Sequence, residues 1–219
     1  LQKSVYDLLI SKYTAEEVVL KNVFPCLDLI PCNINLTGAE VELVGVLSRE
    51  MRLKKALQHI REQYDFVVLD SPPSLGLLTL NSLVASDSII IPIQCEFYAL
   101  EGVSQLLKTI NLVKEGLNLN LEIEGVLLTM ADFRTNLTNE VINEIRNYFK
   151  EKVYKTIIPR NIKLSEAPSF GKPIMLYDHS SLGAKRYLEF AAEFLGIKLD
   201  NFPPANMSNK LSPAGEISN

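Results

Sequence analysis

The chain has 219 residues, of which 47% are hydrophobic, and its mean hydropathy is close to zero at +0.11. This length predicts one globular domain, and no apolar run approaches the ~20 residues that a membrane-spanning helix requires. The net charge of −4 argues against nucleic-acid binding over the whole surface, and three cysteines are too few for a disulfide framework or a paired zinc site. Because no secretory signal is recognisable, we expect a cytoplasmic protein.

Short β-branched runs alternate with longer amphipathic stretches along the chain, which is typical of a mostly parallel sheet with helices on both faces. Thr14 and Glu17 fit a capping box at the start of a helix. Near-continuous apolar character predicts buried strands at residues 27–30, 65–69, 88–93, 123–128 and 153–158. Apolar residues at helical spacing predict helices at residues 48–61, 100–113, 136–149 and 181–195. We therefore expect an α/β domain over residues 1–197.

Composition and charge change toward the C-terminal half. Residues 131–190 hold ten Lys and Arg against seven Asp and Glu, so a local basic face could meet a phosphate backbone although the whole molecule is an anion. After residue 197 the chain becomes rich in Ser, Asn and Pro, with too little apolar surface to offset the entropy of ordering. We expect residues 198–219 to form a disordered tail.

The most informative residue is Asp70, which follows the predicted strand at residues 65–69. A carboxylate at the C-terminal tip of a buried strand lies in the crevice where open α/β sheets bind ligands. In nucleotide hydrolases such an aspartate orients Mg²⁺ and its water against the phosphates. Pro72 and Pro73 restrict the following turn, which could then act as a switch. The alternative is an aspartate that only caps the next helix.

Four stretches carry a family resemblance: DSPPSLGLLT at residues 70–79, IPIQCEFYALEG at 91–102, GVLLTM at 125–130 and IPRNIKLSEAPS at 158–169. In order and spacing they resemble successive blocks of the ParA/Soj family of chromosome and plasmid partitioning ATPases, and the similarity extends over residues 4–195. The resemblance implies a P-loop NTPase fold with ATP and Mg²⁺ as cofactors. It also implies a homodimer, ATP-dependent binding to non-specific DNA, stimulation by a ParB-type partner, association with the nucleoid and no membrane contact.

The resemblance also assigns roles to residues. Asp70 falls on the family's Walker B aspartate, which holds magnesium through water, Pro72 falls in the second switch, and Pro159 falls in the loop beside the adenine. Lysine at position 163 keeps a charge where family members often carry arginine, although it loses the bidentate fork. The alternative for each basic residue is an ordinary solvated surface charge. The candidate DNA-binding residues are Arg134, Arg160, Lys163 and Lys172.

The family's phosphate-binding loop, G-x-x-x-x-G-K-[ST], does not occur in these 219 residues. In the family, this loop and the first strand of the sheet precede the matching region. We therefore expect a P-loop sheet that lacks its first strand and phosphate loop, with apolar surface exposed where that strand would lie. Positioning and charge neutralisation dominate phosphoryl transfer, so the chain alone is expected neither to bind nor to hydrolyse ATP.

Two further interpretations stay open. The chain could be a non-catalytic remnant that serves as a DNA-binding or partner-binding module. It could also be a MinD-like regulator of the division site, which shares the fold. That interpretation requires a basic amphipathic helix at the C-terminus, and residues 201–219 contain one lysine and no apolar stripe.

Overall fold

The computed structural model describes residues 3–97 and 99–199 and divides them into two compact units. The first unit contains residues 3–88 and 106–122, and the second contains residues 89–105 and 123–199. The long helix α6 (Ala99–Gly116) contributes to both. The assignment of residues 1–197 to one domain stays a prediction, and the expected tail lies, from residue 200 onward, outside the described residues.

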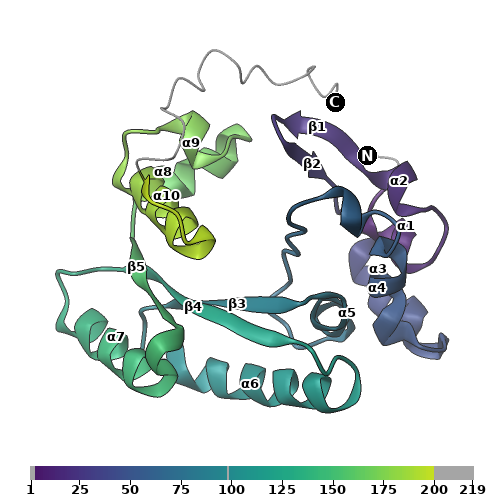
Figure 1. The fold of residues 1–219 in the computed structure, drawn as a ribbon, viewed down its shortest axis with the longest axis horizontal. Coiled ribbons are helices and arrows are strands. Elements are labelled where there is room, and N and C mark those ends of the chain that lie inside the picture. Colours follow the sequence, from purple (N-terminus) through teal and green to yellow (C-terminus); the bar gives the residue numbers. More distant parts are fainter. Residues whose placement is uncertain (1–2, 98, 200–219) are drawn as a thin grey trace. The chain divides into compact units, whose positions relative to one another are not determined.

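The first unit is mainly helical, with one short hairpin (Figure 1). Its hairpin strands pair antiparallel, so the strand predicted at residues 27–30 forms but does not join a parallel sheet. A cluster of small and branched apolar side chains, among them Leu8, Val18 and Leu53, fills the core. The elements of the unit are α1 (Val5–Leu9), α2 (Ala15–Val18), β1 (Leu20–Phe24), β2 (Leu27–Leu29), α3 (Leu36–Glu42), α4 (Arg52–Leu57) and α5 (Leu77–Ala85).

The capping box predicted at Thr14 is confirmed, because the Thr14 amide donates to Glu17 Oε2 at 2.9 Å. A second capping box, which was not predicted, lies at the start of α1. There the Ser4 amide donates to Asp7 Oδ2 at 2.9 Å. Both boxes satisfy amides that a helix N-terminus leaves without partners, and they fix where the two short helices begin.

The helix predicted at residues 48–61 is shorter than expected. Only α4 (Arg52–Leu57) is α-helical, and 3₁₀ turns at Arg49–Met51 and Arg61–Gln63 flank it. The cause is tertiary: Asn81, which is fully buried on α5, accepts a hydrogen bond from the Leu53 amide at 3.1 Å and donates one to the Arg49 carbonyl at 3.0 Å. Asn81 thus takes up backbone groups that a longer helix would have paired internally.

The strand predicted at residues 65–69 is wrong. The structure assigns no strand there, and Val67 and Val68 are 44% and 89% exposed. A strand requires a neighbour for its backbone amides and carbonyls, and the described residues place none beside this segment. The expectation that Asp70 ends a buried central strand is therefore also wrong, because the carboxylate follows an extended and exposed segment.

The second unit is built on a three-stranded parallel sheet with the strand order β3-β4-β5, which confirms the α/β class (Figure 1). The strands predicted at residues 88–93, 123–128 and 153–158 and the three later helices are confirmed with small changes at their ends. Within the described ranges, none of the helices is long and apolar enough to cross a bilayer. The elements are β3 (Ser88–Gln94), β4 (Glu122–Ala131), α7 (Asn136–Phe149), β5 (Val153–Pro159), α8 (Ile162–Glu166), α9 (Ile174–Tyr177) and α10 (Leu182–Leu195).

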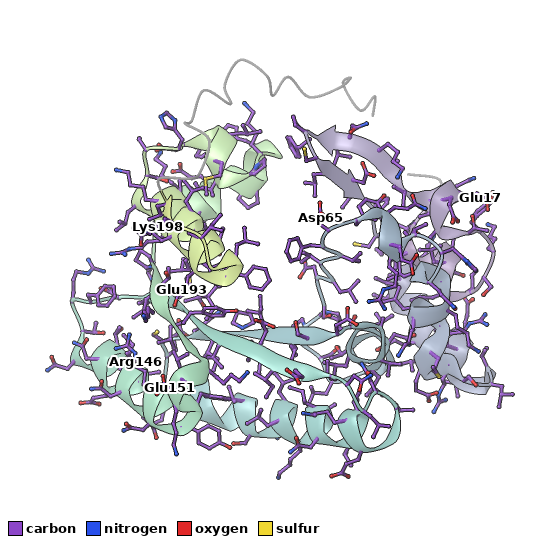
Figure 2. The ribbon with its side chains drawn as sticks, in the orientation of Figure 1. Glu17, Asp65, Arg146, Glu151, Glu193 and Lys198 are labelled. Atoms are coloured by element: carbon purple, nitrogen blue, oxygen red, sulfur yellow. The ribbon has the colours of Figure 1, made fainter. Side chains whose placement is uncertain are left out.

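Strand β5 lies at one end of this strand order, and its register with β4 shifts between Val153 and Ile157. Glu193 of α10, labelled in Figure 2, accepts hydrogen bonds from the amides of Lys155 at 2.6 Å and Thr156 at 2.9 Å. Burial raises the pKa of Glu193, but the two amide hydrogen bonds outweigh that effect and the pKa falls below its usual value. The ionised carboxylate thus supplies acceptors for two consecutive backbone amides within the register shift of β5.

Candidate functional site

A bulge in β4 shapes the carboxyl edge of the sheet. Leu128 pairs with Ile157 and Ala131 pairs with Pro159, so three steps along β4 match two along β5. The additional residue is accommodated at Met130, whose φ of 54° lies in the left-handed region, which a non-glycine residue seldom adopts. The Arg160 amide then donates to the Ala131 carbonyl at 3.0 Å, so the chain segments that leave β4 and β5 start side by side.

Asp132 and Arg134 form a bidentate pair just after β4. Arg134 donates from Nε to Oδ1 at 2.8 Å and from Nη2 to Oδ2 at 2.6 Å, and its amide donates to Oδ1 at 3.2 Å. These hydrogen bonds are the main reason that the pKa of Asp132 falls to about 2, and they raise the pKa of Arg134. The Arg134 side chain is 86% exposed, so the pair stands in solvent at the edge of the sheet.

Arg160 follows β5 and reaches toward the end of β3. Its Nη2 donates to Glu96 Oε1 at 3.1 Å, and its charge also contributes to the low pKa of Asp132. Pro159, the last residue of β5, is buried. The ends of the three strands therefore meet in a cluster of two guanidinium groups and two carboxylates.

Lys163 lies on the short helix α8, whose first turn is capped by the Asn161 side chain. The lysine Nζ donates to Glu166 Oε2 at 2.8 Å, and the hydroxyl of Tyr177 donates to the same oxygen at 2.8 Å. The hydrogen bond from Lys163 is the largest cause, and that from Tyr177 the next, of a lowered pKa at Glu166. Phe170, which is exposed, stacks on Tyr177 with ring centroids 5.0 Å apart.

Lys172 completes the predicted set. It follows Gly171, which has a φ of 60° and ends the 3₁₀ turn Ala167–Phe170, and its amide donates to the Ala167 carbonyl at 3.2 Å. The Lys172 side chain is exposed and has no ion-pair partner within the part of the chain that the structure describes. All four predicted DNA-binding residues thus lie in the second unit, on the segments that leave β4 and β5.

Asp70 and Pro72 belong to the first unit, in the exposed loop before α5. Asp70 forms no hydrogen bond or ion pair with another residue of the described chain. The later part of the loop is held, because Thr79 Oγ1 donates to the carbonyls of Ser74 at 2.5 Å and Pro72 at 3.3 Å. Asp70 therefore lies in the earlier part of the loop, before the residues that Thr79 holds against the first turn of α5.

Gly76 allows a close approach at the same helix terminus. A Cβ atom at this position would lie 2.2 Å from Glu40 Oε1, the atom that accepts a long hydrogen bond of 3.4 Å from the Leu78 amide. A carboxylate at the N-terminus of a helix is favoured by the free amides and by the helix dipole. No local sequence pattern predicts this contact, since Glu40 lies 36 residues before the glycine.

Of the groups that hold Mg-ATP in P-loop ATPases, the sequence supplies a candidate aspartate but no glycine-rich phosphate loop. That aspartate, Asp70, could hold magnesium through water. Across residues 3–97 and 99–199, no three His, Cys, Asp or Glu side chains gather in a group able to hold a metal ion. An open hollow of about 650 Å³ near Arg146 and Glu151 (Figure 2) is lined by none of the seven predicted site residues.

Comparison with known proteins places these features in a family. The family described as AAA domain matches residues 1–123. The sporulation initiation inhibitor protein Soj of Bacillus subtilis is 56% identical over 192 residues, which cover 88% of this chain and 76% of that protein. The chromosome partitioning protein ParA of Myxococcus xanthus is 50% identical over 88% of this chain and 68% of its own length.

This chain is also similar to a solved structure. Cobyrinic acid a,c-diamide synthase from Mycobacterium smegmatis, determined with a bound ATP analogue and magnesium, aligns with a TM-score of 0.75 and 34% identity. The alignment covers 89% of this chain and 72% of that one. Together with the parallel α/β sheet and the four motif stretches, these similarities show that the chain belongs to the ParA/Soj family of chromosome-partitioning P-loop ATPases.

Proposed function

We propose that this chain supplies the DNA-binding face of a ParA-type DNA segregation ATPase. In that role it binds DNA without sequence preference through Arg134, Arg160, Lys163 and Lys172. Binding is coupled to an ATP-dependent homodimer, whose ATP hydrolysis a ParB-type partner stimulates. A protein with this role resides in the cytoplasm on the nucleoid and does not contact the membrane.

The observation that carries the proposal is the position of the four basic residues. The molecule has a net charge of −4, yet these cations lie on the two chain segments that leave the neighbouring strands β4 and β5. Phosphate contacts of this kind fix a protein on a duplex without reading its sequence. The names of the relatives, which refer to chromosome partitioning, support DNA as the ligand of this face.

For Asp70 we propose the Walker B role, in which the carboxylate orients the water shell of magnesium. ATP would supply the free energy that couples dimer formation to DNA binding. The exposed valines at positions 67 and 68, which belong to no strand, support a sheet that another polypeptide segment completes, one that carries a glycine-rich phosphate-binding loop. Without such a segment the chain does not hydrolyse ATP.

Fluorescence anisotropy with a labelled duplex of random sequence tests the DNA role. We expect binding that weakens steeply between about 50 and 200 mM salt, and each of the changes Arg134→Ala and Lys163→Ala should reduce the salt slope by about 0.9. Addition of Mg-ATP should leave the affinity of the chain alone unchanged. If neither substitution changes the affinity or the salt slope, the assignment of the DNA face is contradicted.

A phosphate-release assay tests the catalytic statement separately. Hydrolysis above a buffer blank that disappears in Asp70→Ala would show that the chain is active by itself, and would leave the DNA role untouched. DNA binding without any response to ATP, even after a glycine-rich segment has been supplied in trans, would instead favour the non-catalytic DNA-binding module.

A further inference from the structure

Three of the four proposed DNA-binding cations already have a carboxylate partner within the second unit. The nitrogen of the cation and the oxygen of the carboxylate lie 2.6, 3.1 and 2.8 Å apart in the three pairs. A phosphate can therefore contact the cation only by displacing the carboxylate. Lys172 is the exception within the described chain, since it forms no ion pair. The pairs are Arg134 with Asp132, Arg160 with Glu96, and Lys163 with Glu166.

Two of the three carboxylates have a hydrogen-bond donor besides the side chain of their cation. The Tyr177 hydroxyl donates to Glu166 Oε2, so this oxygen keeps a partner when Lys163 moves away. Asp132 Oδ1 likewise accepts from the backbone amide of Arg134, which does not move with the guanidinium. Both acids therefore stay in place and keep their charge when a phosphate binds the cation instead.

The charge of these acids persists under the conditions of DNA binding. Aspartate and glutamate carboxyl groups ordinarily have pKa values of about 4, so Asp132 and Glu166 stay ionised near neutral pH even when the cations that lower their pKa values turn away. All three pairs stand in solvent, where an ion pair contributes little and a phosphate can exchange for a carboxylate. The acids then repel the incoming phosphate over a few ångströms.

We propose that Asp132, Glu96 and Glu166 compete with DNA phosphates for the basic residues and hold the DNA affinity of this face below what its cations could provide. This inference rests on the proposed DNA role and adds its regulation. The ligand that the face accepts is a phosphodiester backbone, and the carboxylates act as built-in anions that must be displaced first. A face of this kind binds weakly and releases readily as salt rises.

The test is to remove single negative charges and keep the side-chain shape. We expect Glu166→Gln and Asp132→Asn each to tighten binding of the labelled duplex by about twofold to fivefold. The Gln side chain keeps an oxygen acceptor for Tyr177, and circular dichroism confirms that each variant is folded.

Glu189→Gln is the matched control. Glu189 pairs with Arg186 at the same i,i+3 spacing as Glu166 with Lys163, but on α10, away from the strand ends. The change Glu189→Gln removes the same charge from the same residue type as Glu166→Gln does. If Glu189→Gln tightens binding as much as Glu166→Gln, net charge explains the effect and the inference is overturned.

A double variant isolates the specific contact. The gain from Glu166→Gln should vanish when Lys163→Ala is also present, since the acid then has no cation to release. If Lys163→Ala weakens binding while Glu166→Gln changes nothing, only this inference fails. If neither Arg134→Ala nor Lys163→Ala has an effect, or if no form of the chain binds DNA, the proposed function fails and this inference with it.

Discussion

Two apolar segments of this chain have nearly the same sequence character, but one forms a buried strand and the other is exposed and forms none. Residues 65–69 and the middle of β4 both consist mostly of β-branched and large apolar residues. In β4, Val126 and Leu128 are fully buried and paired on both sides, whereas Val67 and Val68 are exposed and belong to no strand. The difference shows that a strand-forming sequence becomes a strand only where backbone partners are present.

Hydrogen exchange gives the largest contrast between the two segments. The amides of Val67 and Val68 have no partner in the described chain and should exchange almost freely. Those of Val126 and Leu128 should exchange slower by a factor of about 1000 or more, because they open only with the sheet. Exchange followed by peptide mass spectrometry or NMR measures both segments in one sample. Equal protection would mean that residues 65–69 are paired in solution.

A matched valine pair tests the same contrast energetically. Val126→Ala should lower the free energy of unfolding by about 2 kcal/mol, since it removes two buried methyl groups and leaves a cavity. Val68→Ala, at a side chain that is 89% exposed, should change it by less than about 0.5 kcal/mol. Urea denaturation followed by circular dichroism compares the two. A larger loss from Val68→Ala would show that its side chain is covered in solution.

The Glu193 carboxylate beside β5 offers a third test, because it accepts hydrogen bonds from two backbone amides. Glu193→Gln should cost about 1 kcal/mol, since the glutamine oxygen keeps one contact as an ordinary hydrogen bond and the NH2 group cannot accept the other. The folded pKa of Glu193 is lowered, so its contribution is present above the unfolded pKa of about 4.3 and is lost as pH falls through the folded pKa. Urea denaturation of both proteins from pH 7 downward should therefore converge at acidic pH, and a difference that persists there would contradict this account.

The smallest expected effect concerns the loop that carries Asp70. Gly76→Ala brings a Cβ atom against Glu40 Oε1, the far end of a flexible side chain that can turn away, so a loss of only about 0.5 kcal/mol is expected. The double variant with Glu40→Ala should recover it. Thermal unfolding of the single and double variants measures the coupling, and a single-variant loss that Glu40→Ala leaves unchanged would point to the backbone of Gly76 instead.

Much of the second unit could be predicted from the sequence. The strands at residues 88–93, 123–128 and 153–158 and the helix at residues 136–149 follow from local periodicity, and their partners are supplied within the same unit. The predicted basic residues follow from sequence position, and the structure places them on the segments that leave β4 and β5. Their carboxylate partners could be suspected only where they lie three or fewer residues away, as Asp132 and Glu166 do.

The contacts that could not be predicted join distant parts of the chain. Glu96 with Arg160, Asn81 with Leu53, and Glu193 with β5 are separated by 64, 28 and up to 38 residues. No local pattern encodes such pairs, because each depends on where the helices and strands come to rest.

The sequence by itself determined the family, the α/β alternation and the cations of the proposed DNA face, because motifs, periodicity and charge are local properties. Tertiary structure alone decided which apolar segments became strands, where helix α4 begins, and that Glu96 pairs with Arg160. The physical reason is the same in each case. Backbone hydrogen bonds and ion pairs require a partner at a fixed short distance, and only the folded chain brings distant partners that close.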